Sequence, residues 1–370
     1  MHELVYQVSF NTPAFLGNAV QQAQWRTPPF KALLRQWWRV VKAAELGYDA
    51  NKLRSAEGQI FGTASDDGPN KSLQSRVRLR LEPHADDDTV QAWAAGGLKQ
   101  WPADEPREFH PEVGRPVGTE LYLGYGPLDY DKATRQARLG TSKSSDKQRT
   151  AIADKVRMTL RMRVPEALTA EIEAAMQLAA WFGTLGSRSR NAWGSLHVEA
   201  RSGTALVPLT RAALAGYTST LRNSLKFDWP HAIGSDERGP LVWFTPERTT
   251  WREVMKDLAR TKIAFRTLAA PFPNERPGAL EARHLIAYPV TNHEVQLEGW
   301  KRNGRLPNQL RFKLIRTSGT KLQGVLVHLP CGLPALLSVG IRGRRPDEAA
   351  LWSAVHRVLD DSKHQLTRLA

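Results

Sequence analysis

Between Gly183 and Gly194 the chain reads Gly-Thr-Leu-Gly-Ser-Arg-Ser-Arg-Asn-Ala-Trp-Gly, which places two arginines among three glycines. Glycine tolerates positive φ and lets a backbone approach another molecule closely. Arginine carries a permanent charge on a planar fork that matches a phosphate group. Taken alone, the segment is best explained as a long turn whose arginines face water. Taken with the rest of the chain, it predicts a loop that holds a polyanion.

The whole chain is basic, since 52 Lys and Arg against 37 Asp and Glu in 370 residues give a net charge of +15. Such a charge predicts attraction to nucleic acid or to an anionic membrane. A membrane partner is disfavoured because the only long apolar run, residues 326–341, contains His328 and two prolines and is too short to span a bilayer. The N-terminus does not resemble a secretory signal, and the single cysteine, Cys331, excludes an intramolecular disulfide. We therefore expect a cytoplasmic protein with a polyanionic partner.

Charge is unevenly distributed along the chain. Residues 132–163 hold ten basic side chains against two acidic ones, and residues 132–155 form a predicted basic loop with a Ser/Lys-rich middle. An acidic insertion at about 82–118 contains prolines and glycines, and we interpret it as irregular and as a candidate protein-contact surface. The basic loop contributes three candidate RNA-binding residues: Lys143, Lys147 and Arg149.

Two predicted strands, residues 75–81 and 156–164, alternate apolar residues with arginines or threonine. Because side chains of a strand point to opposite faces with period two, each strand would bury one face and present arginines on the other. Basic residues also protect edge strands from pairing, which is the alternative explanation. Two such rows beside a basic loop favour a nucleic-acid face, made of Arg76, Arg78, Arg80, Arg157, Arg161 and Arg163.

Helix signals are clear in both halves. Thr27 and Pro28 predict an N-cap and a first helical residue, and apolar side chains follow at helical spacing. A second helix is expected at 165–182, with Gly183 at its C-terminal end. In the second half we predict helices at 249–268 and 346–359 and strands at 284–290, 309–316 and 324–329.

Each half thus mixes strands with two helices, which predicts an α+β fold of two ferredoxin-like (RRM-like) β-α-β-β-α-β domains in tandem with loop insertions. We place the domains at residues 1–205 and 206–370. In such a unit the loop after the second helix leads into the last strand. We therefore expect the glycine-rich loop beside the first helix or over the sheet edge, near Lys31 and Arg35.

Three further segments carry a resemblance to a known family. Residues 11–17 read Asn-Thr-Pro-Ala-Phe-Leu-Gly, residues 29–39 read Pro-Phe-Lys-Ala-Leu-Leu-Arg-Gln-Trp-Trp-Arg, and residues 57–62 read Glu-Gly-Gln-Ile-Phe-Gly. Together with the loop at 183–196, they resemble the RAMP superfamily of CRISPR effector proteins, most of all subunit one of the Cmr (type III-B) complex. The loop departs from the family's common G-G-h-G pattern at Thr184. The resemblance covers roughly the first 200 residues and is weaker around 283–290.

The resemblance implies a pair of ferredoxin-like domains in an RNA-guided complex that acts in antiviral defence. It implies a place at the end of the filament that holds the 3′ part of the guide RNA, beside other RAMP subunits, with target RNA as a further candidate partner. It also implies that the subunit is not a nuclease. The positions that match the family's motifs are Lys31, Arg35, Trp37, Trp38, Arg39, Arg188, Arg190 and Asn191.

The twelve tryptophans raise the question of base stacking. Aromatic faces can stack on unpaired bases, although most tryptophans are core residues. Trp38 and Trp193 are the better stacking candidates, because each lies beside arginines or the basic loop, and Trp37 is expected in the core. Trp38 and Trp193, together with Gly186, Arg188, Arg190 and Asn191, complete the predicted set of RNA-binding residues.

Candidate catalytic residues are few. The clustered carboxylates, Asp66–Asp67, Asp86–Asp88 and Asp129 with Asp131, lie among turn-forming residues, where aspartate commonly serves turn geometry. The ten histidines show no metal-ligand spacing, and no phosphate-loop or dinucleotide fingerprint is present. We therefore predict no catalytic residue, metal, cofactor or small-molecule substrate, and an RNA-binding structural subunit. The alternative is a RAMP-type endoribonuclease that processes guide RNA or cuts target RNA.

Overall fold

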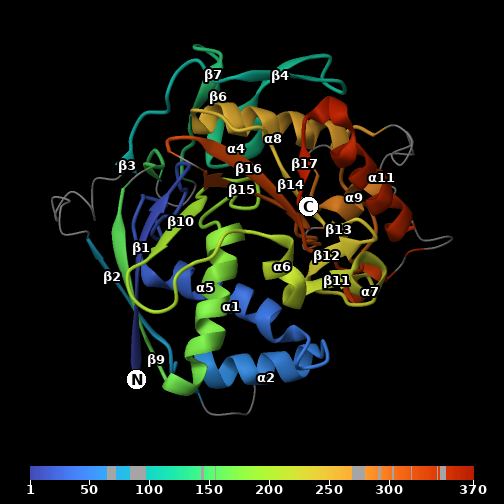
Figure 1. The fold of residues 1–370 in the computed structure, drawn as a ribbon. Helices are drawn as coiled ribbons and strands as arrows, with labels where there is room; N and C mark the ends of the chain where they lie inside the picture. Colours follow the sequence, from blue (N-terminus) through green and yellow to red (C-terminus); the bar gives the residue numbers. More distant parts are fainter. Residues whose placement is uncertain are drawn as a thin grey trace.

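The computed structural model describes residues 1–64, 72–83, 97–142, 146–154, 156–268, 280–290, 293–301, 304–317, 319–339, 341 and 347–370. Two four-stranded antiparallel sheets, one in each half of the chain, carry the main helices (Figure 1). The α+β class predicted from the sequence is confirmed. Among the described residues, no helix combines the length and the apolar character that crossing a membrane requires.

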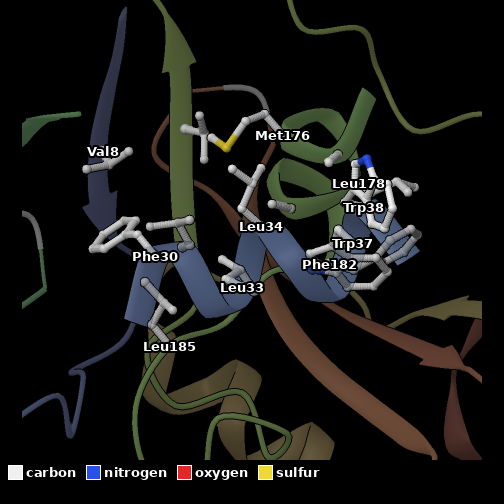
Figure 2. Close-up of a cluster of buried hydrophobic side chains, with 14 of the residues drawn as sticks. Val8, Phe30, Leu33, Leu34, Trp37, Trp38, Met176, Leu178, Phe182 and Leu185 are labelled. Carbon is white, nitrogen blue, oxygen red and sulfur yellow. The ribbon is translucent and has the colours of Figure 1, made fainter. Parts of the chain in front are cut away.

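The N-terminal sheet has the strand order β10-β1-β9-β2. Its strands are β1 (His2–Phe10), β2 (Arg78–Pro83), β9 (Met158–Val164) and β10 (Leu196–Ala200). Alternate β1 side chains from Leu4 to Phe10 are buried, as period two requires, and pack toward α1 (Thr27–Ala43) and α5 (Thr169–Phe182). Figure 2 shows Phe30, Leu33 and Leu34 of α1 in this core with Met176 of α5.

The arginine strands are shorter than predicted. The first begins at Arg78 instead of Ser75, because the Arg76 amide donates to the Ile60 carbonyl at the end of α2 (Ala50–Phe61). Pairing with β9 starts at Arg78, opposite Arg163. The second strand begins at Met158, so Arg157 lies just outside it. The apolar face of β9 is buried as predicted, whereas on β2 Leu81 is buried and Leu79 is half-buried.

The C-terminal sheet has the order β15-β16-β14-β17. Its strands are β14 (Val242–Phe244), β15 (Leu310–Arg316), β16 (Leu322–His328) and β17 (Thr367–Arg368), and its helices include α8 (Trp251–Arg266) and α11 (Glu348–Asp360). In both sheets the fourth strand of the β-α-β-β-α-β succession lies beside the first, and the first beside the third. A smaller sheet of β11 (Thr218–Thr220), β12 (Ile233–Asp236) and β13 (Gly239–Pro240) lies between the two in sequence.

The strand predicted at 284–290 is wrong, because residues Ala282–Ile286 form the short helix α9. A ring nitrogen of His284 accepts a hydrogen bond from the Glu281 amide at 2.9 Å and so caps the helix start. The apolar pattern that suggested a strand is explained by burial on all sides, which does not distinguish a strand from a short helix.

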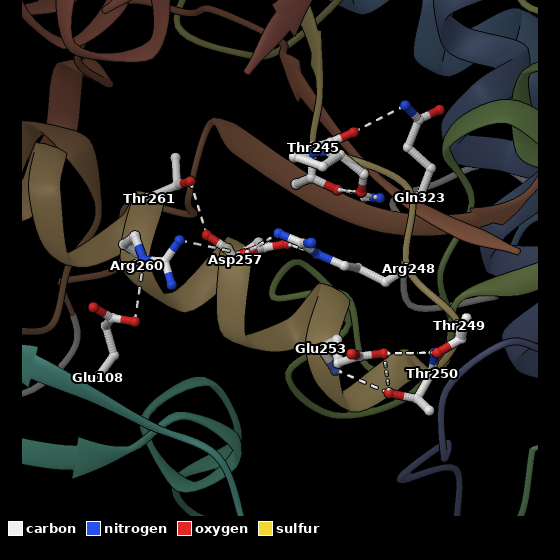
Figure 3. A network of polar contacts seen from close by, with 12 residues as sticks. Glu108, Thr245, Arg248, Thr249, Thr250, Glu253, Asp257, Arg260, Thr261 and Gln323 are labelled. Atoms are coloured by element: carbon white, nitrogen blue, oxygen red, sulfur yellow. Dashed lines mark hydrogen bonds and ion pairs between the residues drawn. The ribbon is translucent and has the colours of Figure 1, made fainter. Parts of the chain in front are cut away.

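The described part of the acidic insertion contains the β4 (Arg107–His110) and β5 (Arg115–Gly118) hairpin, which contacts α8. Glu108 pairs with Arg260 of α8 at 3.1 Å (Figure 3). Glu112 pairs with Arg283 at 3.0 Å. These carboxylates therefore serve contacts within the chain. The short strand β3 (Gly97–Leu98) precedes this hairpin within the insertion. After the insertion come α4 (Thr119–Gly124), the β6 (Leu128–Asp131) and β7 (Gln136–Leu139) hairpin, and β8 (Ala151–Ile152).

Candidate nucleic-acid interface

The glycine-rich loop and the Asn11–Gly17 motif fold as one hydrogen-bonded unit. The Gly194 amide donates to the Pro13 carbonyl at 3.0 Å, and the Ser187 amide donates to the Phe15 carbonyl at 3.0 Å. Gly186 has φ of +97°, and a Cβ at this position would lie 2.7 Å from the Phe15 carbonyl oxygen. Only glycine fits at this position, so the packing of the loop against the Asn11–Gly17 motif depends on Gly186.

This unit lies against the C-terminal half of the chain. The Phe312 amide of β15 donates to the Arg190 carbonyl at 3.0 Å. The Leu314 amide donates to Ser195 Oγ at 2.8 Å, and Asn11 Nδ2 donates to the Leu314 carbonyl at 3.0 Å. The glycine-rich loop is therefore a joint between the two halves and not a free surface turn.

The expected neighbours of the loop need correction. Its apolar start does lie by the first helix, where Leu185 packs in the core near Phe30 (Figure 2). Its arginines, however, interact with residues outside α1. Arg188 donates from Nε to the Tyr125 carbonyl at 2.6 Å, and the charge of Arg190 helps to lower the pKa of Arg311 on β15. Lys31 has a pKa lowered by burial and by Arg35, its neighbour on α1.

Arg188 shares one end of this joint with Lys262 of α8. Lys262 Nζ donates to Asn191 Oδ1 at 3.1 Å and lies 5.4 Å from the centre of the Tyr122 ring. Asn191 is buried and donates in turn to the Leu123 carbonyl at 2.9 Å. Burial, and then the charges of Arg266 and Arg188, lower the pKa of Lys262 to about 7. No ion pair with a carboxylate is found for Lys262 or Arg188 among the described residues.

A second pair of like charges, Arg190 and Arg311, occupies the same joint. Arg311 of β15 is 7% exposed, and its guanidinium lies 5.7 Å from the Trp37 ring centre. Its Nε has no hydrogen-bond partner among the described residues. Burial and the charge of Arg190 lower the pKa of Arg311 to about 9. Burial also lowers the pKa of Arg190.

We call these five side chains the seam cations: Arg188, Arg190, Lys262, Arg266 and Arg311. Arg188 is exposed, whereas the other four side chains are partly or wholly buried. Holding like charges in such places costs free energy unless an opposite charge compensates them. A polyanion at this joint would provide that compensation, so the joint is suited to phosphate groups.

The C-terminal contributors were missed by the sequence analysis, although signals for them exist. Lys262 and Arg266 stand four residues apart on α8 and therefore share a helix face. Arg311 and Lys313 alternate with apolar residues in β15, as in the two arginine strands. Lys313 is 1% exposed and donates from Nζ to the Ala179 carbonyl of α5 at 3.0 Å. This contact ties the two halves together.

The second candidate surface is the open face of the N-terminal sheet. The register pairs Arg78 with Arg163 and Arg80 with Arg161, so the two predicted rows do come together. Acidic residues lie among them, since Arg161 pairs with Glu82 at 2.9 Å. A hollow of about 440 Å³ is lined by Met1, Glu3, Arg78 and Arg163. Arg76 is exposed just before the strand, and Arg157 is half-buried.

The predicted arginines of α1 are engaged within the domain. Arg35 and Arg39 both pair with Glu57 of α2, with Arg39 Nη2 at 2.8 Å from Glu57 Oε1. Glu57 is 3% exposed. Burial raises its pKa, but the hydrogen bonds and charges of Arg39 and Arg35 outweigh burial and lower it overall. Glu57, the first residue of the segment 57–62, thus anchors α2 to α1.

Replacing Glu57 by glutamine is expected to lower the free energy of unfolding by about 2 kcal/mol, because hydrogen bonds to charged groups contribute about 1.5–3 kcal/mol. Glu45→Gln is the control, since Glu45 is 65% exposed and pairs only with Lys42 among the described residues. It should change stability by less than about 0.5 kcal/mol. Chemical denaturation measures both, and equal stabilities of the two variants would contradict an anchoring role for Glu57.

The stacking role predicted for Trp38 and Trp193 needs correction. Both side chains are 0% exposed. Trp38 donates from Nε1 to Glu171 Oε2 at 3.0 Å, and Trp193 packs edge-on against Trp101 and Trp251. Neither indole can stack on a base in this structure, because no face of either ring is accessible. Trp37 is in the core as expected.

The basic loop is described only in part. Lys147 is exposed and Arg149 is half-buried, whereas Lys143 lies outside the described residues. Asp131, at the end of β6, accepts from the Ala133 amide at 2.9 Å, as a turn residue does, and Asp129 in the same strand accepts from the Tyr130 amide at 2.8 Å. Asp66, Asp67 and the 86–88 cluster lie outside the described residues. In the described part of the chain, no three His, Cys, Asp or Glu side chains gather as metal ligands would.

Comparison with known proteins gives matches among solved structures alone. No protein-family model matches the chain, and no curated protein matches it. Cmr1 from Pyrococcus furiosus in its apo form is similar over 100% of this chain and 99% of its own, with 14% identity and a TM-score of 0.48. Two chains of the type III-B Cmr-β complex bound to cognate target RNA, one of them with AMPPnP and single-stranded DNA present, have 11% identity. They cover 89% and 96% of this chain and 94% and 98% of their own, with TM-scores of 0.45 and 0.41. The first of these neighbours bears the name of subunit one of the Cmr complex, the subunit that the sequence motifs resemble most.

Proposed function

We propose that this protein is an RNA-binding structural subunit of a type III-B (Cmr) CRISPR effector complex, with guide RNA and other RAMP subunits as its partners. Within that complex it would cap the filament near the 3′ end of the guide RNA and contribute to antiviral defence. The family resemblance of the motifs at 11–17, 29–39, 57–62 and 183–196 supports the complex. A place in the cytoplasm follows from the sequence and stays a prediction.

The observation that carries RNA binding is the set of seam cations. Two come from the family's glycine-rich loop and three from the C-terminal half, and neither Arg190 nor Lys262, both partly buried, has a carboxylate partner among the described residues. A cation that served stability would be expected to pair, because an unpaired charge removed from water is costly. Binding of a phosphate backbone gives these residues their missing counter-charge.

The architecture supports two ferredoxin-like domains in tandem. Each four-stranded sheet arises from a β-α-β-β-α-β succession with its fourth strand beside the first. In this arrangement the seam cations lie where the two domains meet, and the open face of the N-terminal sheet offers a second basic surface. The boundary near residue 205 stays a prediction.

The alternative, a RAMP-type endoribonuclease, needs an acid–base pair beside the RNA. His197 is the histidine nearest to the motif unit in sequence, and it bonds Glu199 at 3.1 Å with a pKa lowered first by burial. His197 is itself a residue of β10, where it pairs with Ser9 of β1. We therefore assign it a structural role in the sheet and no catalytic role. That the subunit is not an enzyme stays a prediction.

The test is the salt dependence of RNA binding. We expect the purified protein to bind single-stranded RNA without strong sequence preference, with log K falling linearly against log salt. Each neutralised phosphate should contribute a slope of about −0.7, so three to five seam contacts predict a slope of about −2 to −3.5. Fluorescence anisotropy with a labelled oligonucleotide measures this. Absence of binding at low salt, or a flat response, would sink the proposal.

A further inference from the structure

Trp229 is the tryptophan that the fold leaves available for stacking. Among the described tryptophans, only Trp229 and Trp251 are not buried. Trp251 packs edge-on against Trp101 and Trp193, which occupies it within the core. Trp229 instead lines an open pocket of about 790 Å³ together with Tyr48 and Phe227, both of which are also partly exposed.

The three rings of this pocket are held in place by His231. Its ring centre lies 4.9 Å from that of Tyr48, 4.7 Å from Phe227 and 5.2 Å from Trp229. His231 is 0% exposed, and Nδ1 is 3.0 Å from the Trp229 carbonyl oxygen. Burial lowers the pKa of His231, which disfavours the charged form of the ring. The pocket therefore has a fixed aromatic wall, formed before any ligand binds.

The pocket lies close to the seam cations. The Phe227 carbonyl accepts a hydrogen bond from the Gly332 amide at 2.7 Å, which joins the pocket wall to the residue after Cys331. The Cys331 amide donates to Gln309 Oε1 at 2.9 Å, and Gln309 stands two residues before Arg311 of the seam cations. Residues 331 and 332 are thus hydrogen-bonded both to the pocket wall and to the segment that leads to Arg311. An RNA strand bound at the seam could therefore place a neighbouring nucleotide in the pocket.

We propose that this pocket takes one unpaired base of the bound RNA, stacked against the Trp229 and Tyr48 side of the aromatic wall. Unpaired bases are recognised by stacking on aromatic side chains and by hydrogen bonds to their edges. The pocket offers the exposed Asp228 carboxylate for amino groups of a base, and exposed Lys226 at its rim suits an adjoining phosphate. This inference rests on the proposed RNA-binding function and adds a subsite to it.

A segment of a partner protein is the competing occupant. Leu336 is 79% exposed and Val339 is 60% exposed beside the pocket, and exposed apolar side chains can mark protein contacts. The observations favour a base, because the pocket combines three aromatic rings with polar edges and lies near cations without carboxylate partners. The two occupants differ in what they predict for the isolated protein, which lacks other subunits.

The experiment measures the affinity of the full-length protein for labelled single-stranded RNA across a range of salt concentrations. Trp229→Ala should weaken binding about tenfold at every salt concentration, because stacking is not a counterion effect. Trp229→Phe, which keeps an aromatic face, should recover most of the loss. Phe109→Ala is the matched control, since Phe109 is 55% exposed on β4, and it should bind as the parent does.

Three outcomes separate the possibilities. A parallel downward shift of log K against log salt for Trp229→Ala, with unchanged slope and melting temperature, supports the base pocket. Parental affinity in Trp229→Ala and Tyr48→Ala, with RNA binding otherwise intact, would overturn the pocket while leaving the proposed function standing. Parental affinity together with failure of the same variants to co-purify with co-expressed type III-B subunits would assign the pocket to a protein contact. If Trp229→Ala melts early, the comparison is made with Trp229→Phe and Tyr48→Ala.

Discussion

Replacement of both Arg188 and Arg190 by alanine is expected to weaken the binding of single-stranded RNA at least about tenfold. Charge-assisted hydrogen bonds contribute about 1.5–3 kcal/mol each, and about 1.4 kcal/mol already corresponds to a factor of ten. The salt slope should become shallower by about 0.7 for each phosphate that the variant no longer neutralises. Stability should change little, because both arginines lie beside like charges, Lys262 and Arg311, whose repulsion the double variant relieves.

The matched control removes two charges elsewhere. Arg357 and Lys363 are exposed on α11 and the turn that follows it, remote in sequence from both candidate RNA surfaces. Arg357→Ala with Lys363→Ala has the same net charge as the loop variant, so any loss of affinity that follows net charge alone appears in both. If the two double variants bind RNA equally well at each salt concentration, the glycine-rich loop is a structural joint and not a phosphate site.

Raising the pH through the range 6.5 to 8.5 is expected to weaken RNA binding about tenfold through Lys262. The pKa of this residue is about 7 in the free protein, lowered by burial, Arg266 and Arg188. A phosphate nearby favours the charged form and raises that pKa, so binding above pH 7 requires uptake of a proton. Lys262→Arg should bind with a flatter pH profile, because arginine stays charged throughout.

The stability of the free protein provides an independent check on Lys262. The unfolded state binds more protons than the folded state between pH 7 and about 10, the usual pKa of lysine being about 10.4. Stability therefore rises with pH in that window for the parent protein, and less so for Lys262→Met. Identical pH profiles of parent, Lys262→Arg and Lys262→Met, in both binding and unfolding, would show that Lys262 stays charged and that water reaches its ammonium group within the joint.

Periodicity alone was sufficient to identify several of the longer regular elements of this chain. The helix predicted at 249–268 corresponds to α8, and its boundaries follow from local chemistry, since Thr250 and Glu253 form a capping box (Figure 3). The strand predicted at 309–316 corresponds to β15. Where burial surrounds a segment on all sides, as at His284, periodicity carries no information and the prediction failed. The α+β class thus follows from the sequence.

The sequence by itself determined which residue types are present and which local element carries each of them. It showed a basic chain, arginines on one face of two strands, and glycines in the loop that contacts the Asn11–Gly17 motif. What only the tertiary structure decided was the partner of each charge. Arg35 and Arg39, predicted to face RNA, have Glu57 about twenty residues away as a partner, whereas Arg190 meets Arg311 from the other half of the chain. Burial and pairing of a charge depend on residues far apart in sequence, which local patterns do not encode. For the same reason the accessible aromatic wall is at Trp229 and not at Trp38 or Trp193.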